Sequence, residues 1–418
     1  MPDNSEALPS GSRSRRNNIK RTKRDRKKEM TSEGVSRGYT EKILSGPMDL
    51  PFFLIIMVLL VMGIIMMFSA GYAWAIAEGN DGTYYVKRQL AMAVVGLVFM
   101  FVVSFLDYHF YRKPVIVFGL FFFSIILLIL CRVGPFTDPH NYAYRWLKIG
   151  PLPSFQPSEI MKLAIILLFS YLISINYSRM KEFKYGIVPF LICLGVVVGL
   201  MALQPHFSGT IIICCIGIIM MFVGGSNVKQ LIFLGILGVI AIAILMLLLI
   251  KFKGVTYIEK RIVSWLDPFN EEAADDTWQT RNSLIAIGSG GLFGLGLGNS
   301  RQKFLYLPES KNDFVFAVVC EELGFIGALM VIILFLLFII RGFYIASKAP
   351  DKFGMMLAVG LVVQIGLQAL LNIAVVTNAI PNTGVSLPFF SYGGTALIMQ
   401  LVQMGIVLNI SRQSLIKN

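Results

Sequence analysis

Ionisable side chains gather in one short stretch, residues 299–324, that lies between long apolar segments. An ionisable group is expensive to place at membrane depth, so such groups mark functional sites by default. The stretch reads NSRQKFLYLPESKNDFVFAVVCEELG and carries Arg301, Lys303, Glu309, Lys311, Asp313, Glu321 and Glu322. It is therefore the first place to look for acid–base chemistry or for the binding of an anion.

Asp313 stands where this stretch turns into an apolar helix, and its position admits two interpretations. A carboxylate at a helix start is stabilised by the free backbone N–H groups and by the helix dipole, which makes Asp313 a candidate N-cap. Alternatively, the carboxylate is a general base that takes a proton from a substrate hydroxyl group. The cations Arg301, Lys303 and Lys311 favour the second interpretation, because they suit an anionic pyrophosphate beside the base.

A second charged pair lies in the segment FQPSEIMKLAIILLF, where Glu159 and Lys162 are three residues apart. This spacing puts both side chains on one face of a helix, and Pro157 suits the helix start. A lysine at that depth needs a partner or a wet cavity. The pair therefore either locks this helix to its neighbours or lines a substrate cavity. Just upstream, Arg145 and Lys148 offer two further cations for substrate binding.

Polar residues also recur in the last two apolar segments. Gln364, Gln368 and Asn372 follow one another at i,i+4 spacing, and Gln400 and Gln403 lie in the final segment. Hydrogen bonding between helices is the favoured interpretation of these stripes, and contact with a ligand is the alternative.

The segment between these two apolar runs, residues 377–394, reads TNAIPNTGVSLPFFSYGG and is rich in proline and glycine. Irregular backbone at membrane depth is tolerated only where it is buried in protein or lines a cavity. We therefore expect a re-entrant segment on the outer side, with Ser391 as its candidate substrate contact.

The composition places these residues in a membrane protein. Of the 418 residues, 56% are hydrophobic and only 15% are charged, which excludes an ordinary water-soluble domain. Repeated apolar runs of about 20 residues predict an all-α polytopic fold. We expect about ten transmembrane helices, near residues 48–70, 88–107, 114–132, 157–175, 186–204, 208–224, 229–250, 313–340, 353–377 and 389–410.

The net charge of +13 is read as a topology signal, since many of the basic residues lie in the first fifty positions. Nothing folded accompanies this basic run, so nucleic acid is not an expected partner. We expect a disordered cytoplasmic tail over 1–45, a transmembrane domain over 46–412 and a cytoplasmic C-terminus over 413–418. Lysine and arginine in alternate short loops put both termini inside, which makes 251–312 a long extracytoplasmic loop.

Two other residue classes indicate no cofactor. The five cysteines form no CxxC and the three histidines are scattered, so no zinc site is expected. The glycine-rich run 288–298 matches neither phosphate-binding loop pattern. Its small residues predict close approach of two backbones or a re-entrant turn.

Several motifs, in order, resemble the SEDS family of bacterial cell-wall polymerases, which comprises FtsW, RodA and SpoVE. The motifs are RWLKIG, QPSEIMKLA, RIVSWLDPF, GLGLGNSRQKFLYLPE, DFVFAVVCEELG and LPFFSYGG, and the similarity covers about residues 48–412. The resemblance implies a ten-helix fold that polymerises lipid II together with a class B penicillin-binding protein. It also implies that Asp313 is the essential carboxylate, and it matches Glu159 and Lys162 to the family's QPSExxK motif.

The chain departs from the family pattern at two places. Where QPD-x-GT is usual, residues 204–210 read QPHFSGT, so His206 replaces an acid and one residue is added. Before Asp313 the chain reads SKN where HT is common, which places Lys311 beside the expected base. The WLDPF and LGNSRQK motifs are nearer to the FtsW and SpoVE branch, with roles in division or sporulation, than to the elongation branch.

The sequence and the resemblance together predict an inverting glycosyltransferase of the bacterial cytoplasmic membrane. Asp313 would deprotonate the acceptor's 4-hydroxyl group, while Arg145, Lys303 and Arg301 neutralise the leaving undecaprenyl pyrophosphate. A divalent cation, Mg²⁺ or Mn²⁺, is a candidate helper that the resemblance suggests, and divisome proteins are expected partners. Two alternatives stay open: a lipid II flippase with a path past Glu159 and Lys162, and a non-catalytic scaffold for the transpeptidase.

Overall fold

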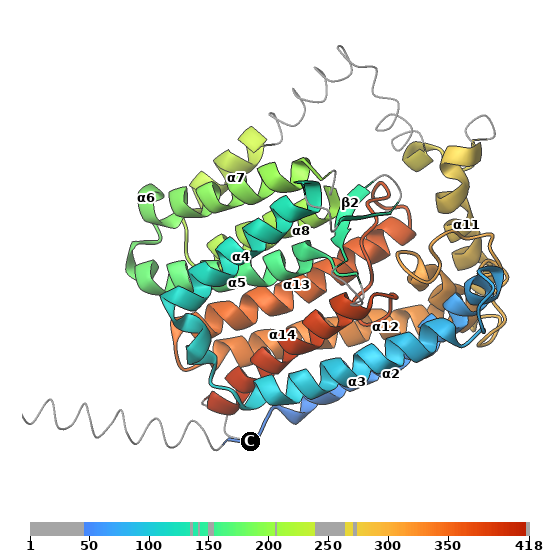
Figure 1. Ribbon diagram of the computed structural model, residues 1–418, viewed down its shortest axis with the longest axis horizontal. Helices are drawn as coiled ribbons and strands as arrows, with labels where there is room; N and C mark the ends of the chain where they lie inside the picture. Colours follow the sequence, from blue (N-terminus) through green and yellow to red (C-terminus); the bar gives the residue numbers. More distant parts are fainter. Residues whose placement is uncertain are drawn as a thin grey trace, which may run out of the picture. The chain divides into compact units, whose positions relative to one another are not determined.

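The computed structural model describes residues 46–133, 137–140, 143–148, 154–204, 207–238, 264–270 and 274–414 (Figure 1). Residues 48–418 form one compact unit. The predicted cytoplasmic tail, residues 1–45, lies outside the described residues, as does His206.

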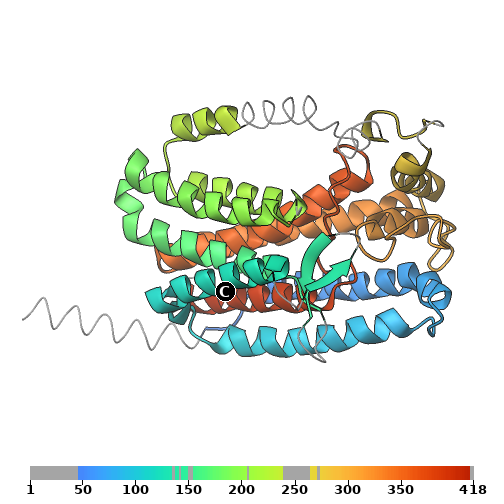
Figure 2. The same ribbon diagram turned by 45° about the horizontal axis from the view of Figure 1, so that its top comes forward.

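Long helices make up nearly all of the described unit. They are α2 Leu50–Ala77, α3 Tyr84–Phe105, α4 Pro114–Val133, α5 Pro157–Asn176, α7 Val188–Ala202, α8 Phe207–Val223, α11 Ala274–Gly290, α12 Val315–Ser347, α13 Lys352–Val376 and α14 Gly394–Gln413. Short elements join them: η1 Tyr108–Arg112, η2 Tyr177–Arg179, α6 Phe183–Gly186 and the apolar helix Val228–Gly238. Strands β1 Thr137–His140 and β2 Ala143–Leu147 form an antiparallel hairpin that packs on α4, and β2 also contacts α5 (Figure 2).

The all-α polytopic fold is confirmed. In the described residues, eight helices are long and apolar enough to cross a membrane, and two shorter apolar helices, Ser208–Val223 and Val228–Gly238, lie where the sixth and seventh spans were predicted. Each of the ten predicted spans thus coincides with a helix, although residues 239–250 of the seventh lie outside the described part. Several boundaries were misplaced: α2 continues to Ala77, α12 continues to Ser347, and α14 begins only at Gly394.

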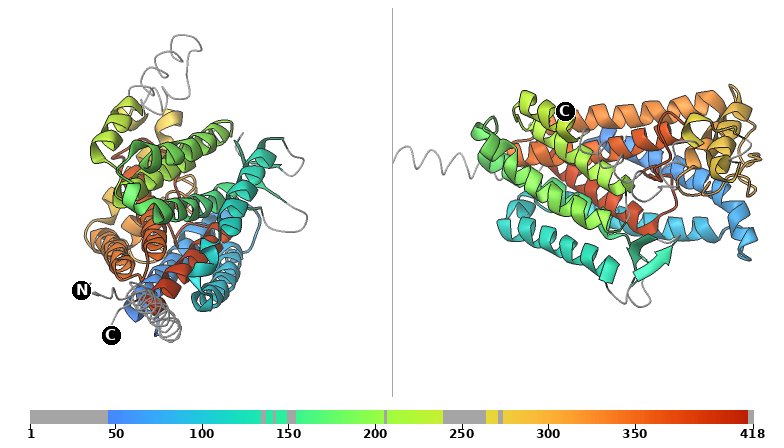
Figure 3. Two further views of the ribbon diagram at one scale, coloured as in Figure 1. Left: turned by 90° about the vertical axis from the view of Figure 1, so that its left-hand side faces the viewer. Right: turned by 90° about the horizontal axis from the view of Figure 1, so that it is seen from above.

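Three helices form the centre of the bundle, which Figure 3 shows from its end. The most apolar windows of α5 and α13 are 72% buried and that of α14 is 67% buried, against 33–39% for α2, α3, α4 and α12. Small residues allow the closest approach: a Cβ on Gly405 of α14 would lie 2.5 Å from the carbonyl oxygen of Met100 in α3. The central helices therefore contact protein nearly all round, and the outer ones expose apolar side chains.

Helix α12 is broken at Gly324, whose backbone (φ 67°, ψ −166°) is not helical. The glycine-rich loop after α11 supplies hydrogen-bond partners for the backbone groups on both sides of this break. The N–H groups of Phe325 and Ile326 donate to the carbonyls of Gly291 and Leu292, and those of Leu295 and Gly296 donate to the carbonyls of Glu321 and Glu322. A Cβ on Gly294 would lie 2.1 Å from the carbonyl oxygen of Glu322. The predicted close approach of two backbones in this run is therefore confirmed.

The irregular segment 377–393 enters the bundle, as predicted. Val385, Leu387, Phe389 and Phe390 are buried, and a Cβ on Gly63 in α2 would lie 2.2 Å from the carbonyl oxygen of Phe389. Since Gly63 lies near the middle of α2, the segment reaches well inside the helix ends.

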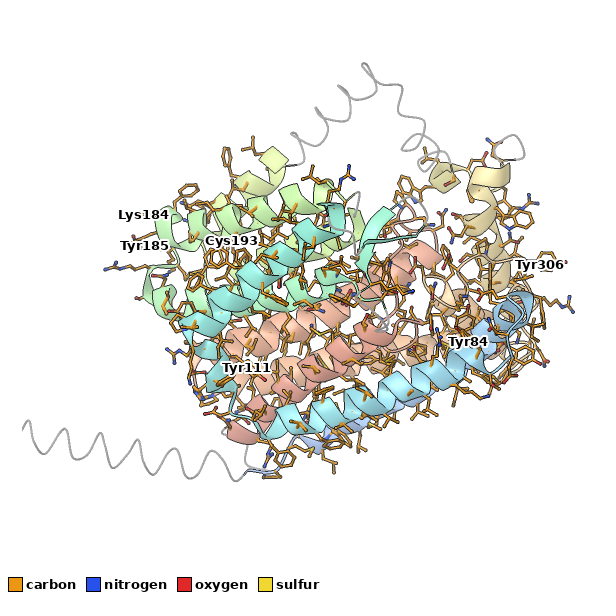
Figure 4. All side chains as sticks on the ribbon, viewed as in Figure 1. Tyr84, Tyr111, Lys184, Tyr185, Cys193 and Tyr306 are labelled. Atoms are coloured by element: carbon orange, nitrogen blue, oxygen red, sulfur yellow. The ribbon has the colours of Figure 1, made fainter. Side chains whose placement is uncertain are left out.

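Labelled residues mark the two ends of the bundle. Lys184 and Tyr185 lie at one end and Tyr84 and Tyr306 at the other (Figure 4). A cavity of about 350 Å³ near the first end is lined by Lys181 and residues 225–229. We call the end with Lys184 the basic end and the opposite one the outer end.

At the basic end, His109 closes a polar cluster between the α3–α4 connection and the start of α13. Its Nδ1 lies 2.7 Å from Asp107 Oδ1 and its Nε2 lies 3.6 Å from Asp351 Oδ2. Arg112 and the Tyr108 hydroxyl group also contact Asp351. The hydrogen bond with Asp351 raises the pKa of His109 above its usual value, and the contact with Asp107 adds to this against the opposing effect of partial burial.

The stabilising effect of His109 should therefore depend on pH. Because the folded-state pKa is raised, the contribution is complete below the usual histidine pKa of about 6.5 and is lost as the pH rises through the raised value. We expect His109→Gln to lower the melting temperature of the detergent-solubilised protein most near pH 6. The difference from wild type should shrink above the raised pKa, and a difference independent of pH would contradict this account.

Candidate active site

Asp313 lies in a tight turn just before α12. The Glu309 carbonyl accepts hydrogen bonds from the N–H groups of Asn312 (2.9 Å) and Phe314 (3.2 Å), and Glu309 has a φ of 55°. The N-cap of α12 is Phe314, and no side chain caps this helix start. The N-cap interpretation of Asp313 therefore misplaced the cap by one residue, since Phe314 occupies that position.

Two buried polar side chains hold this turn against the re-entrant segment. Asn372 Nδ2, on α13, donates to the Asp313 carbonyl (2.6 Å) and to the Val385 carbonyl (2.7 Å). Ser391 Oγ donates to the Asn312 carbonyl (2.6 Å) and accepts from the Leu387 N–H group (2.7 Å). The predicted site residues Asp313, Ser391 and Glu309 are thus brought together, with Ser391 and Glu309 holding the backbone around Asp313.

The carboxylate of Asp313 lies directly against Gly384. An ideal Cβ at Gly384 would be 3.2 Å from Asp313 Oδ2 and 4.0 Å from Ser208 Oγ, and Gly384 has a φ of 68°. Ser208, at the start of α8, donates to the carbonyl of Thr383. The carboxylate therefore lies where the starts of α12 and α8 meet the re-entrant segment, and glycine is required there for space and for backbone conformation.

Lys303 is not exposed to a substrate but is buried in a polar network. Its Nζ lies 2.9 Å from Glu322 Oε1 and donates to Ser69 Oγ (2.9 Å) and to the Gly298 carbonyl (2.5 Å). Ser69 Oγ in turn donates to the same Glu322 oxygen. The ammonium and carboxylate groups are 3% and 0% exposed, so this cation is used to hold residues 298–303 onto α12 and α2.

Glu321 completes the attachment of this loop. Its carboxylate accepts hydrogen bonds from the Arg301 N–H group (2.9 Å) and from the Ser300 hydroxyl group (2.5 Å). Both Glu321 and Glu322 are buried, which agrees with the expectation that at least one faces the interior. Glu321 thus accepts from backbone and hydroxyl donors, and Glu322 also accepts from the Lys303 ammonium group.

Lys311, two residues before Asp313, joins the turn to the connection between α2 and α3. Its Nζ lies 2.9 Å from Glu78 Oε1, donates to the Tyr85 hydroxyl group (2.5 Å) and lies 3.9 Å from the Tyr85 ring centroid. Burial alone would raise the pKa of Glu78, but hydrogen bonds from Tyr85 and Lys311 outweigh it and lower that pKa. The extra cation of this chain therefore anchors the turn that carries Asp313 through an ion pair and an aromatic ring.

Other predicted cations are differently placed. Arg301 and Lys148 are exposed. Arg145 is part of β2, and Lys148 follows that strand directly. The hairpin packs on α4 and α5, so these two residues come from a different part of the outer end than the turn with Asp313.

The second predicted pair forms a buried ion pair. Lys162 Nζ lies 2.8 Å from Glu159 Oε1, with side chains 3% and 9% exposed, near the start of α5. The other carboxylate oxygen, Glu159 Oε2, is buried and has no hydrogen-bond partner among the described residues. The pair is thus an internal charge pair with one carboxylate oxygen still available.

The described residues contain no cluster of potential metal ligands. Among them, no group of three or more His, Cys, Asp or Glu side chains gathers in a way that could hold an ion. This finding concerns sites built by the protein alone, whereas Mg²⁺ is commonly held by one or two carboxylates together with substrate phosphates.

Sequence reasoning missed four residues that shape the site: Ser69, Ser208, Asn372 and Gly384. Two of them carried a signal: Asn372 belonged to the i,i+4 polar stripe that was assigned to helix contacts, and Gly384 belonged to the proline- and glycine-rich segment that was expected to be re-entrant. Ser69 and Ser208 lie in apolar helices and make their contacts with residues far away in the sequence.

The geometry of this site can now be compared with known proteins. The family model for cell cycle proteins of the FtsW, RodA and SpoVE type matches residues 50–415. This chain belongs to the FtsW/RodA/SpoVE family. Among curated relatives it is similar to stage V sporulation protein E of Bacillus subtilis, 39% identical over 88% of this chain and 97% of that one. A probable peptidoglycan glycosyltransferase FtsW of Geobacter sp. (strain M18) is 34% identical over 87% and 96% of the two chains.

Solved structures of the FtsW/RodA/SpoVE family agree with the fold. A chain from a peptidoglycan synthase complex, studied for its coordination of polymerization and crosslinking, matches with a TM-score of 0.71 and 25% identity over 87% of this chain and 98% of that one. The rod shape determining protein RodA of Thermus thermophilus matches with a TM-score of 0.63 and 25% identity over 88% and 98%. This chain is therefore a multi-pass membrane protein with the architecture of its family.

The role of Lys303 in holding the loop can be tested by Lys303→Met. Removing one partner of a buried ion pair leaves an uncompensated charge and typically costs about 3–5 kcal/mol. We expect the thermal midpoint of the purified protein to fall by several degrees. Arg301→Gln, two residues away and exposed, is the matched control and should leave the midpoint unchanged; equal midpoints for both variants would refute the structural role.

Proposed function

We propose that this peptidoglycan glycosyltransferase of the FtsW/RodA/SpoVE family uses Asp313 as the general base in polymerising lipid II. The observation that carries the proposal is the attachment of the turn 309–314: Asn372, Ser391 and Lys311 fix its backbone from three sides, yet its carboxylate projects against Gly384. A base must be held in place while it meets its substrate, and such positioning supplies much of the catalytic effect.

In the proposed reaction, Asp313 accepts the proton of the acceptor sugar's 4-hydroxyl group. The resulting oxygen attacks the anomeric carbon of the donor, the bond to undecaprenyl pyrophosphate breaks with its electron pair, and the configuration is inverted. The pyrophosphate leaves without a strong general acid if its negative charge is neutralised. Arg301 and Lys148, both exposed, and Arg145 on β2 are the cations proposed for that task.

The buried cations have another part in this proposal. Lys303 forms a buried ion pair with Glu322, so we assign it to holding the loop. Ser391 and Glu309 are assigned to holding the turn through their hydrogen bonds to its backbone. The Glu159–Lys162 pair is assigned to the floor of the site, below the re-entrant segment. Substrate contact by these residues stays a prediction.

The proposed orientation places Asp313 outside the cell. The basic end of the bundle carries Lys181, Lys184 and Lys229, which the positive-inside rule assigns to the cytoplasm. Both termini are then cytoplasmic and the site faces the side where the cell wall is built. A class B penicillin-binding protein and divisome proteins are the proposed partners, supported by the match to a chain from a peptidoglycan synthase complex.

Asp313→Asn tests the base directly. A general base contributes about 10²–10⁴-fold, so we expect polymerisation of labelled lipid II, in detergent with the transpeptidase present, to fall by at least that range while the melting temperature is kept. Asp267→Asn, an exposed acid in the same outer loop, is the matched control and should keep activity. Glycan formation at the wild-type rate by Asp313→Asn would remove Asp313 from the role.

Gly384→Ala tests the contact between the carboxylate and the re-entrant segment. A methyl group 3.2 Å from Asp313 Oδ2, at a backbone φ of 68°, must displace one of the two. A displacement of about 1 Å can cost about 100-fold, so we expect a 10- to 100-fold lower turnover. Gly195→Ala, on α7 with open space around the added methyl group, should behave as wild type. Equal activity of the two variants would show that Gly384 does not position the carboxylate.

A further inference from the structure

A stripe of buried polar atoms along α13 lacks protein partners. Among the described residues, the atoms without a hydrogen-bond partner include Gln364 Oε1 and Nε2, Gln368 Oε1 and Asn372 Oδ1, together with Ser158 Oγ and Glu159 Oε2 of α5. All five residues are at most 7% exposed. Buried polar atoms in folded proteins are nearly always paired, so this concentration requires an explanation.

The packing of the two central helices puts these atoms in one column. A Cβ on Gly360 of α13 would lie 2.5 Å from Ile166 of α5. The two helices run in opposite directions (Figure 1), so one turn toward the outer end brings Gln364 to the level of Lys162. A second turn brings Gln368 to the level of Ser158 and Glu159. The i,i+4 spacing keeps each residue on the facing stripe.

The chemistry of the column identifies what fills it. Four of the six atoms, on Glu159, Gln364, Gln368 and Asn372, are oxygens that can only accept, so they cannot satisfy one another. Water supplies two donors for each molecule, and buried water typically makes about three hydrogen bonds to such groups. A cation is a poorer fit, because the Lys162 ammonium already lies beside Glu159.

The column ends at the residue that holds the catalytic turn. Asn372 uses its Nδ2 to bind the carbonyls of Asp313 and Val385, while its Oδ1 has no donor within the described part of the chain. A water molecule that donates to Oδ1 would keep the amide from turning over and so keep Nδ2 on Asp313.

We propose that a column of buried water lies between α5 and α13, bound by Gln364, Gln368 and Glu159, and that through Asn372 it holds the turn carrying Asp313. Gln364 and Gln368 are thereby positioning residues that act on the turn from a distance. The catalytic consequence rests on the proposed function, whereas the column itself does not.

Gln368→Met in the full-length protein, purified with its transpeptidase, tests the column. Methionine keeps the length of the side chain and removes its polar atoms. If water is bound there, the substitution breaks its network and the melting temperature falls by a few degrees. If the site is dry, the substitution removes an unpaired polar group and the melting temperature rises, which would overturn the proposal. Leu361→Met, on the same helix, controls for the new side chain and removes no polar group.

Two further measurements report how Gln368→Met affects the turn that carries Asp313. Backbone hydrogen exchange of residues 309–316 should become at least tenfold faster in Gln368→Met than in Leu361→Met; unchanged exchange would overturn the link through Asn372. In the lipid II assay, kcat should fall about tenfold with an unchanged KM, since the base is displaced and the substrate contacts are not. The melting and exchange measurements decide the proposal even if the wild-type protein proved inactive, which would instead refute the proposed function.

Discussion

Irregular backbone inside an apolar bundle must find all of its hydrogen-bond partners within the protein, and this constraint shapes the whole outer end of the molecule. The break of α12 at Gly324 frees N–H and carbonyl groups that no water can satisfy. The loop 291–296 supplies partners for both kinds, and the carboxylates of Glu321 and Glu322 accept from the N–H groups of residues 298 and 300–302. The loop and the broken helix therefore form one structural unit that neither could form alone.

This unit sets the place of the catalytic turn. Lys303 fixes the loop to α2 through Ser69, Ser310 accepts a hydrogen bond from Trp74 Nε1, and Lys311 binds Glu78 at the end of α2. From the other side, Asn372 and Ser391 attach the turn to α13 and to the re-entrant segment. Most polar side chains around Asp313 thus stabilise its backbone, which leaves the carboxylate as the group directed at Gly384.

The sequence predicted the fold well, because an apolar run of about 20 residues has the length of a helix that crosses the hydrocarbon core of a bilayer. It also predicted the Glu159–Lys162 pair, since i,i+3 spacing fixes two side chains on one face. It could not predict the buried network of Lys303. Ser69 and Lys303 are 234 residues apart in the sequence, and Lys303 is buried only because the fold brings these two residues into contact. The N-cap interpretation of Asp313 misplaced the helix start by one residue, because the tight turn at Glu309, whose positive φ no local pattern signals, precedes an N-cap at Phe314.

The cations of the outer end consequently divide into two groups with different consequences for catalysis. Lys303 and Lys311 are neutralised by Glu322 and Glu78, so their charge is largely compensated within the protein and contributes little to attracting an anion. Arg301 and Lys148 keep exposed side chains, and an exposed cation can be desolvated by an arriving pyrophosphate, where its interaction with the anion becomes stronger than it is in water. The chain thus separates the cations that hold the turn with Asp313 from those that are exposed, and under the proposed function only the exposed ones meet the leaving group.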